Sequence, residues 1–166
     1  INGLSVLAII PARSGSKGIP GKNIIDFCGK PLLSWTINQC LKTDLVSDVW
    51  VSSDDNDILD EAKSYRAKVI KRPVNISDDF NTSESGWLHA IDYLGDRVGS
   101  IDAILAPQVT SPLRETDDII NAIEKSRCEA KGSQIFKGIC TNICNKHNKD
   151  LNNQNLNNKN ENLIAM

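Results

Sequence analysis

The chain has 166 residues, of which 40% are hydrophobic and 24% are charged, and a formal net charge of −2. This length and composition predict one globular domain with a core of its own, and the charge gives no reason to expect a nucleic acid as partner. No apolar run is long enough to cross a membrane and no charged leader precedes an apolar segment, so we expect a cytoplasmic protein without a membrane partner.

Strand-like and helix-like segments alternate along the chain. Apolar runs predict four strands, at residues 5–10, 48–52, 68–71 and 101–106. Segments with helical periodicity separate these runs. Such alternation is typical of a mostly parallel sheet with helices packed against it, so the predicted fold class is α/β.

Four helices are predicted between and after these strands. Pro31 opens the first, which carries apolar residues as far as Leu41, and residues 54–65 form the second. Asn81 and Glu84 have the spacing of a capping box at the start of the third. We expect that helix to bury four apolar side chains, those of Trp87, Leu88, Ile91 and Leu94. The last helix has a predicted cap and an apolar face, formed by Thr116 and by Ile119, Ile120 and Ile123, respectively.

The run from Pro11 to Asn23 directly follows the first predicted strand and is the most informative part of the sequence. It combines cationic side chains with glycines, namely Arg13, Lys17 and Lys22 with Gly15, Gly18 and Gly21. Glycine lets the backbone bend so that its N–H groups can meet an anion, and the cations offset the charge of that anion. Because open α/β sheets bind ligands where strands end, this run predicts a phosphate-holding loop.

Two familiar glycine-rich motifs do not describe this loop. A Walker loop has Ser or Thr after its Gly-Lys pair, but Asn23 follows Gly21 and Lys22, and Ser16 stands where that motif has its first glycine. The dinucleotide fingerprint needs glycines at alternate positions, which the loop does not provide. The sequence therefore favours neither a P-loop NTPase nor an NAD enzyme.

A second polar loop follows the fourth predicted strand. It offers neutral hydrogen-bonding groups and a guanidinium fork suited to a carboxylate or phosphate, supplied by Gln108, Thr110, Ser111 and Arg114. Because the carboxyl ends of parallel strands share one edge of a sheet, we expect both loops at that edge. Asp54 and Asp55 follow another predicted strand, where they either approach a nucleotide or cap the next helix.

Four ordered motifs resemble those of the acylneuraminate cytidylyltransferases, or CMP-sialic acid synthetases. They are Ala12 to Asn23, Val51-Ser-Ser-Asp54, the pair Arg72-Pro73, and Gln108 to Arg114. The likeness covers the N-terminal three quarters of the chain and implies a Rossmann-like nucleotidyltransferase fold. It also implies an enzyme that transfers CMP from CTP to a sialic acid or a related nonulosonic acid, a nine-carbon 2-keto sugar acid, and releases pyrophosphate.

The resemblance further implies roles for individual residues. Catalytic neutralisation of the triphosphate charge would belong to Arg13, Lys17 and Lys22. Nucleotide binding would involve Arg13, Ser14, Gly15, Lys17, Lys22, Asn23, Arg72 and Ser83. The sugar acid would contact Gln108, Thr110, Ser111 and Arg114. Arg114 has an alternative role, the support of its own loop. The resemblance also implies magnesium as a cofactor and a homodimer as the assembly.

The character of the sequence changes after residue 127. Ten of the 21 residues from Asn142 to Asn162 are asparagine. So few apolar groups cannot offset the entropy lost on ordering, so we predict a nucleotide-binding domain at 1–127 and a largely disordered tail at 128–166. The five cysteines do not form a disulfide framework, and the group Cys140, Cys144 and His147 does not match a zinc pattern.

Two segments of the resembled family have no match in this tail, namely the late aspartates that hold magnesium and the dimerisation segment. We therefore expect a truncated version of the fold, with no set of metal ligands in this chain and weak self-association at most. Two alternatives to a complete sialic acid enzyme stay open. One is a catalytically silent nucleotide-binding fragment, and the other is a cytidylyltransferase for a different acid sugar, such as an eight-carbon ketosugar.

Overall fold

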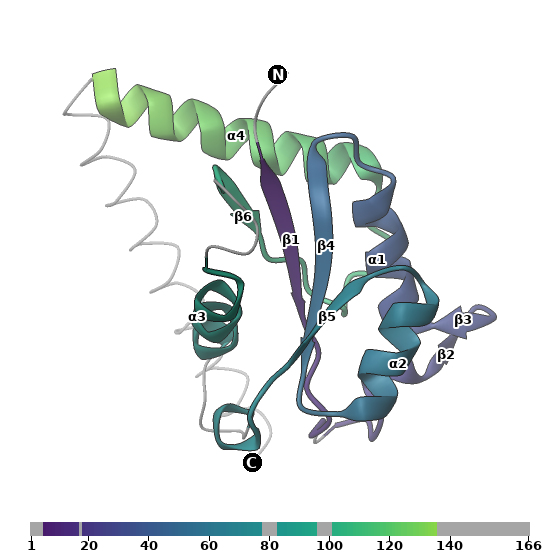
Figure 1. Ribbon diagram of the computed structural model, residues 1–166. Helices are drawn as coiled ribbons and strands as arrows, with labels where there is room; N and C mark the ends of the chain where they lie inside the picture. Colours follow the sequence, from purple (N-terminus) through teal and green to yellow (C-terminus); the bar gives the residue numbers. More distant parts are fainter. Residues whose placement is uncertain (1–4, 17, 78–82, 96–100, 136–166) are drawn as a thin grey trace, which may run out of the picture. The chain divides into compact units, whose positions relative to one another are not determined.

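A four-stranded parallel sheet forms the centre of the fold (Figure 1). The computed structural model describes residues 5–16, 18–77, 83–95 and 101–135. The strands are β1 (Val6–Pro11), β4 (Val46–Ser53), β5 (Lys68–Lys71) and β6 (Ala103–Leu105), and their order in the sheet is β5-β4-β1-β6. All three strand pairings in this sheet are parallel. The predicted α/β fold with a mostly parallel sheet is therefore confirmed.

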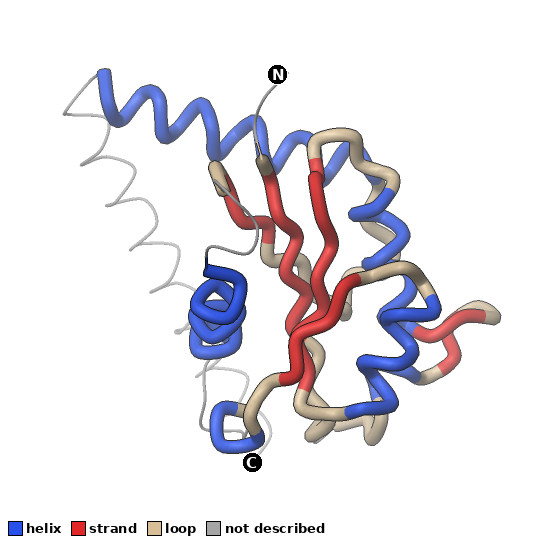
Figure 2. Tube along the Cα trace, viewed as in Figure 1, coloured by secondary structure: helices blue, strands red, loops and turns tan. Residues whose placement is uncertain are grey.

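Helices cover both faces of the sheet (Figure 2). Helix α1 (Leu32–Leu41) follows β1 and α2 (Asn56–Ser64) follows β4, and both pack on one face. Helix α3 (Ser83–Leu94) lies on the other face, where it packs against β1. Among the described residues, no helix has both the length and the apolar character that a membrane crossing needs.

Helix α4 (Thr116–Ile135) is longer than expected. The chain separates into two compact units, residues 1–120 and 121–166, and α4 begins in the first and continues into the second. Thr116 is already helical, and the backbone N–H of Glu115 donates to Asp118 Oδ2 at 2.9 Å, so the helix cap lies one residue before the predicted one. The helix passes residue 127, and the predicted boundary there stays a prediction.

Strand β1 is buried on both faces. Leu7 and Ile9, which point to one face, pack with Ala90 and Leu94 of α3 and are at most 1% exposed. The residues that alternate with them are equally buried on the face covered by α1, because successive side chains of a strand point to opposite faces. A strand buried in this way reads as a continuous apolar run, as the sequence does here.

The strand order reverses at β1. From β1 the chain moves outward through β4 to β5, and then returns across the other face to add β6 on the opposite side of β1. β1 and β6 are parallel neighbours, so their carboxyl ends lie at the same edge of the sheet. The loop after β1 and the loop after β6 therefore both begin at this edge, as predicted.

A small hairpin between the first loop and α1 is a feature that the sequence analysis missed. Its strands are β2 (Asp26–Phe27) and β3 (Lys30–Pro31), joined by Cys28 and Gly29 with φ angles of 54° and 81°. Two positive φ angles in succession are typical of tight two-residue hairpin turns. Strands this short have no detectable periodicity, so the sequence pattern did not predict them.

The buried face of α3 differs from the predicted one. Leu94 is fully buried, but Leu88 is 66% exposed and Ile91 is 38% exposed. The face toward the sheet instead contains Gly86, Ala90 and Leu94, which are four residues apart and so lie on one stripe of the helix. The predicted cap at Asn81 lies outside the described residues.

Because α3 buries this face, the same substitution should lower the free energy of unfolding by different amounts at two positions of the helix. Leu94→Ala should lower the free energy of unfolding by about 2–5 kcal/mol, because it leaves a cavity in the core. Leu88→Ala should change it by less than about 0.5 kcal/mol, because that side chain is largely in solvent. Urea unfolding followed by circular dichroism measures both values. Equal losses would contradict the observed face of the helix.

Candidate functional site

Two arginines lie at the carboxyl edge of the sheet, on either side of the end of β4. The backbone N–H of Ala12 donates to the Ser52 carbonyl at 3.0 Å, so the loop after β1 starts as an extension of that strand. In the same way, the N–H of Arg72 donates to the Ser53 carbonyl at 2.8 Å. Arg13 and Arg72 therefore follow directly from strands that flank β4. Their charges are close enough for Arg13 to lower the pKa of Arg72.

Asp54 stands between these two segments, just after β4. Its Oδ1 accepts a hydrogen bond from the backbone N–H of Ser14 at 3.1 Å, and its Oδ2 accepts one from Ser14 Oγ at 2.6 Å. Oδ1 also lies 3.8 Å from Arg72 Nη2. Burial opposes ionisation of Asp54, but the bonds from Ser14 and the charge of Arg72 outweigh it, so the pKa of Asp54 lies below its ordinary value.

Arg72 is a buried cation whose hydrogen-bonding capacity is only partly used. The residue is 5% exposed, and neither Nε nor Nη2 donates a hydrogen bond to any residue that the structure describes. Burial lowers the pKa of Arg72, while the charge of Asp54 raises it. Because an unpaired N–H group away from water is costly, these donors mark a place where an acceptor from a ligand would be stabilised.

The loop after β1 is closed by Asn23. This residue is 6% exposed, and its Nδ2 donates to the backbone carbonyl of Arg13 at 2.8 Å. A short 3-10 helix, η1 (Lys22–Ile24), precedes the hairpin, and Gly21 before it has a φ of 63°, a conformation that favours glycine. Asn23 therefore holds the two ends of the loop together, and Lys22 follows the turn that closes it.

The loop after β6 is supported from within by Arg114. Arg114 Nη2 donates to the Gln108 carbonyl at 3.3 Å, which spans the loop, while the side chains of Gln108, Thr110 and Ser111 are exposed. Arg114 also lies near Cys40 of α1: burial raises the pKa of that thiol to about 11, and the charge of Arg114 opposes the rise. These contacts favour the supporting role that the sequence left open for Arg114.

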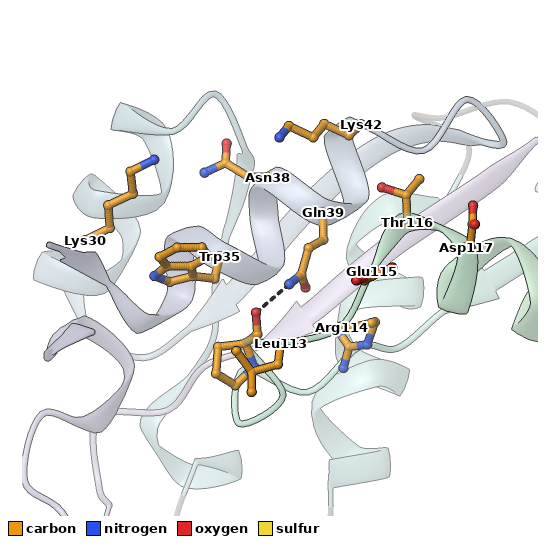
Figure 3. Close-up of a pocket in the computed structure, with 11 residues that line it drawn as sticks. Lys30, Trp35, Asn38, Gln39, Lys42, Leu113, Arg114, Glu115, Thr116 and Asp117 are labelled. Atoms are coloured by element: carbon orange, nitrogen blue, oxygen red, sulfur yellow. Dashed lines mark hydrogen bonds between the residues drawn. The ribbon is translucent and has the colours of Figure 1, made fainter. Parts of the chain in front are cut away.

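A cavity of about 660 Å³ lies on the side of this loop that faces α1 (Figure 3). Gln39 Nε2 of α1 donates to the Pro112 carbonyl at 2.7 Å across its floor, and Trp35 and Leu113 give it apolar walls. Neither Arg13 nor Arg72 lines it. The cavity is therefore separate from the edge where the two arginines meet.

Comparison with known proteins identifies the family. The model of a family described as Cytidylyltransferase matches residues 7–161. The chain belongs to this cytidylyltransferase family. It is 42% identical to the pseudaminic acid cytidylyltransferase of Campylobacter jejuni over 120 residues, and 36% identical to the CMP-N,N'-diacetyllegionaminic acid synthase of Legionella pneumophila over 132 residues. The resemblance found in the sequence is thus confirmed.

The chain spans about half the length of these relatives. The two alignments cover 72% and 77% of this chain, but 52% and 56% of the relatives. Among solved structures, it is similar to a CMP:2-keto-3-deoxy-manno-octonic acid synthetase complexed with CTP, with a TM-score of 0.64, 23% identity, and coverage of 74% of this chain and 47% of that one. This likeness supports the Rossmann-like nucleotidyltransferase fold.

The structure brings together only part of the predicted site. Ser14 and Arg72 meet at one edge of the sheet through Asp54, which the sequence analysis considered only as a helix cap or a nucleotide neighbour, and Arg13 lies close enough to affect the charge of Arg72. Asp55, rather than Asp54, caps α2, because its Oδ1 accepts from the N–H groups of the first helical turn. Two predicted residues cannot be placed: Lys17 lies outside the described residues, and so does the side chain of Ser83.

The described part of the chain contains no cluster of three or more His, Cys, Asp or Glu side chains that could hold a metal ion. Asp54 lies beside Arg72, and its oxygens already meet Ser14 and Arg72. Cys140, Cys144 and His147 lie outside the described residues, as does all of the chain from residue 136. The implied cofactor thus stays a prediction from the family resemblance.

The lowered pKa of Asp54 predicts a pH-dependent contribution to stability. A carboxyl group with a depressed folded pKa stabilises the protein above its unfolded pKa, and this stabilisation is lost as the pH falls through the folded pKa. Asp54→Asn should therefore lower the free energy of unfolding by about 1–3 kcal/mol at pH 7. The difference from the original chain should shrink below pH 4, near the ordinary Asp pKa of 3.8.

Urea unfolding between pH 7 and pH 3 measures this difference. Asp60→Asn is the matched control, because Asp60 is 71% exposed and pairs with Lys63 in solvent, where an ion pair contributes little. A loss for Asp54→Asn that does not change with pH would show that the charge of Asp54 has no part in it.

Proposed function

We propose that the chain binds CTP at the carboxyl edge of β1, β4 and β5, and that the protein transfers CMP from this CTP to a nonulosonic acid. The observation that carries this proposal is the guanidinium of Arg72, which is 5% exposed, lies near Arg13, and has two nitrogens without a hydrogen-bond acceptor in the described part of the chain. A buried, unsatisfied cation next to a second cation is expensive unless an anionic ligand completes it.

The charge balance of the site supports a polyanionic ligand. Arg13 and Arg72 contribute two positive charges at this edge, and Lys22, which follows the turn that closes the loop after β1, adds a third; Asp54 contributes a negative charge beside Arg72. A triphosphate matches this excess, and a guanidinium donates to its oxygens in a fixed fork. The carboxyl edge of the strands, which these residues follow, is the usual ligand site of open α/β sheets.

The proposed reaction is an in-line substitution at the α-phosphorus of CTP. The 2-hydroxyl oxygen of the sugar acid forms a bond to this phosphorus, the bond from phosphorus to the oxygen of the β-phosphate breaks, and pyrophosphate leaves while the hydroxyl proton passes to solvent. In this proposal, Arg13 and Lys22 offset the charge that develops on the leaving pyrophosphate. Arg72 orients the nucleotide, and catalysis comes mainly from positioning.

The sugar acid is proposed to approach from the loop after β6. The exposed side chains of Gln108, Thr110 and Ser111 offer donors and acceptors for its hydroxyl groups, and they follow β6, which lies on the other side of β1 from β4. Named relatives act on pseudaminic, legionaminic and neuraminic acids. We therefore propose a nonulosonic acid as the substrate class, with these three as the candidates, and magnesium as the accompanying ion.

A second candidate function is nucleotide binding without transfer. The observation that favours it is the lack of a metal-ligand cluster among the described residues. Phosphoryl-transfer sites usually combine such ligands with cations that hold the phosphates. The described residues include cations at the sheet edge, so binding of CTP there would not require a cluster of metal ligands.

Pyrophosphate release separates the two candidates. The chain is incubated with CTP, magnesium and, in turn, N-acetylneuraminic, pseudaminic, legionaminic and 3-deoxy-manno-octulosonic acids. Transfer predicts release that depends on one of the nine-carbon acids. Release with the eight-carbon acid alone would overturn the proposed substrate class. Binding of CTP by calorimetry without release in any mixture would select the second candidate.

The triphosphate assignment predicts a ligand-dependent effect of Lys22. Lys22→Ala should weaken CTP binding by roughly tenfold to a hundredfold, the equivalent of one charge-assisted hydrogen bond, because Lys22 is assigned to the phosphates. It should leave the weaker binding of cytidine nearly unchanged. Calorimetric titrations measure both affinities, with Lys63→Ala on α2 as the control, since Lys63 is exposed and pairs with Asp60. Equal losses for the two ligands would count against a phosphate role.

A further inference from the structure

The position of Arg72 needs an explanation beyond its own hydrogen bonds. Its side chain is 6% exposed, yet among the described residues it has one ion pair, the 3.8 Å approach of Nη2 to Asp54 Oδ1, and no acceptor for Nε or Nη2. The arginine side chain rotates about four covalent bonds, and with so few hydrogen bonds it has several alternative rotamers. Its guanidinium is therefore held in place by the groups that surround it.

Asp54 restrains the guanidinium from the side of the first loop. Both carboxylate oxygens of Asp54 are fixed by Ser14, through the backbone N–H at 3.1 Å and through Oγ at 2.6 Å. The carboxylate is 9% exposed, so its attraction for Arg72 is only weakly screened by water. Ser14 and Arg72 follow β1 and β5, which lie on opposite sides of β4, and Asp54 connects them.

On the side of α3, the guanidinium packs against Gly86. A Cβ atom at position 86 would lie 2.5 Å from Arg72 Nη1 and 3.7 Å from its Cζ. Gly86 is buried on the same stripe as Ala90 and Leu94, one and two turns further along the helix. At Leu94, the leucine side chain itself fills the space between α3 and the sheet. At Gly86, which has no side chain, the side chain of Arg72 fills this space.

A glycine inside a helix normally reduces stability. Relative to alanine it costs roughly 0.5–1 kcal/mol, because its backbone loses more freedom on folding. Space for the Arg72 guanidinium is the structural reason for Gly86 in α3, and Ala at this position would displace the far end of a flexible side chain rather than the backbone. We therefore expect Gly86→Ala to leave α3 folded and to displace the guanidinium of Arg72.

We propose that Asp54 and Gly86 are positioning residues that hold the Arg72 guanidinium with its unpaired N–H groups directed to the nucleotide. This inference rests on the proposed function, because it assigns the acceptor of those groups to an oxygen of CTP. Neither residue needs to contact the nucleotide. Asp54 acts through its charge and its bonds to Ser14, and Gly86 acts through the absence of a side chain.

A double-mutant cycle on CTP affinity tests the role of Gly86. Gly86→Ala should weaken CTP binding by roughly tenfold or more, the scale of one lost charge-assisted hydrogen bond, without lowering the melting temperature. Arg72→Lys removes the Nη1 atom that meets the new Cβ, so Gly86→Ala should have little further effect in that background. Leu88→Ala, on the exposed face of the same helix, should leave the affinity unchanged.

The cycle has two results that overturn the proposal. One is an equal loss of affinity from Gly86→Ala with Arg72 and with Lys at position 72, which would indicate a general effect on α3. The other is no loss with Arg72 present. Asp54→Asn, which keeps the shape and removes the charge, should also weaken binding, and Asp54→Glu should restore part of it if the charge is what holds Arg72.

A measurement without nucleotide separates this proposal from the proposed function. The Nε–H resonance of Arg72, assigned by its loss in Arg72→Lys, should shift in Gly86→Ala and in Asp54→Asn but not in Leu88→Ala. If the shifts occur and the chain does not bind CTP, the positioning holds and the proposed function fails. If CTP binds and the resonance does not move in either variant, the positioning role is wrong.

Discussion

The burial of β1 on both faces is the constraint on which the rest of this structure depends. Its side chains are at most 1% exposed from Val6 to Ile10, so a helical layer is needed on each side of the sheet. Helices α1 and α2 cover one face, and α3 covers the other. The chain therefore changes face after β5 and adds β6 beside β1, which places the loop after β1 and the loop after β6 at the same edge of the sheet.

The charges at this edge follow from the same arrangement. β4 lies between β1 and β5, so the residues after these three strands form a row in which Asp54 separates Arg13 from Arg72. One carboxylate among the cations reduces their repulsion but does not cancel their charge. The remaining positive charge and the unused donors of Arg72 suit a phosphorylated ligand, and the hydrogen bonds from Ser14 keep the carboxylate itself from moving.

Local sequence patterns predicted the elements better than they predicted the faces. The strand at Lys68–Lys71 was found at the predicted residues, and β1 and α1 were found within one residue, because apolar runs and a Pro31 helix start are local signals. The buried face of α3 was predicted only in part: Leu94 is buried and Trp87 packs against the core, but Leu88 and Ile91 are exposed. Leu88 and Ile91 fit helical periodicity, but a helix that lies close to a sheet and leaves room for a guanidinium turns its small residues inward.

By itself, the sequence determined the α/β alternation, the cationic glycine-rich loop at the end of a buried strand, and the membership in the cytidylyltransferase family. Each depends on residues that are neighbours in the chain or on motifs in a given order. Only the tertiary structure decided that Ser14, Asp54, Arg72 and Gly86 act on one another, and that Arg114 supports its loop. The first four come from four separate segments, and their contacts exist only because the packing of strands and α3 brings those segments to one edge.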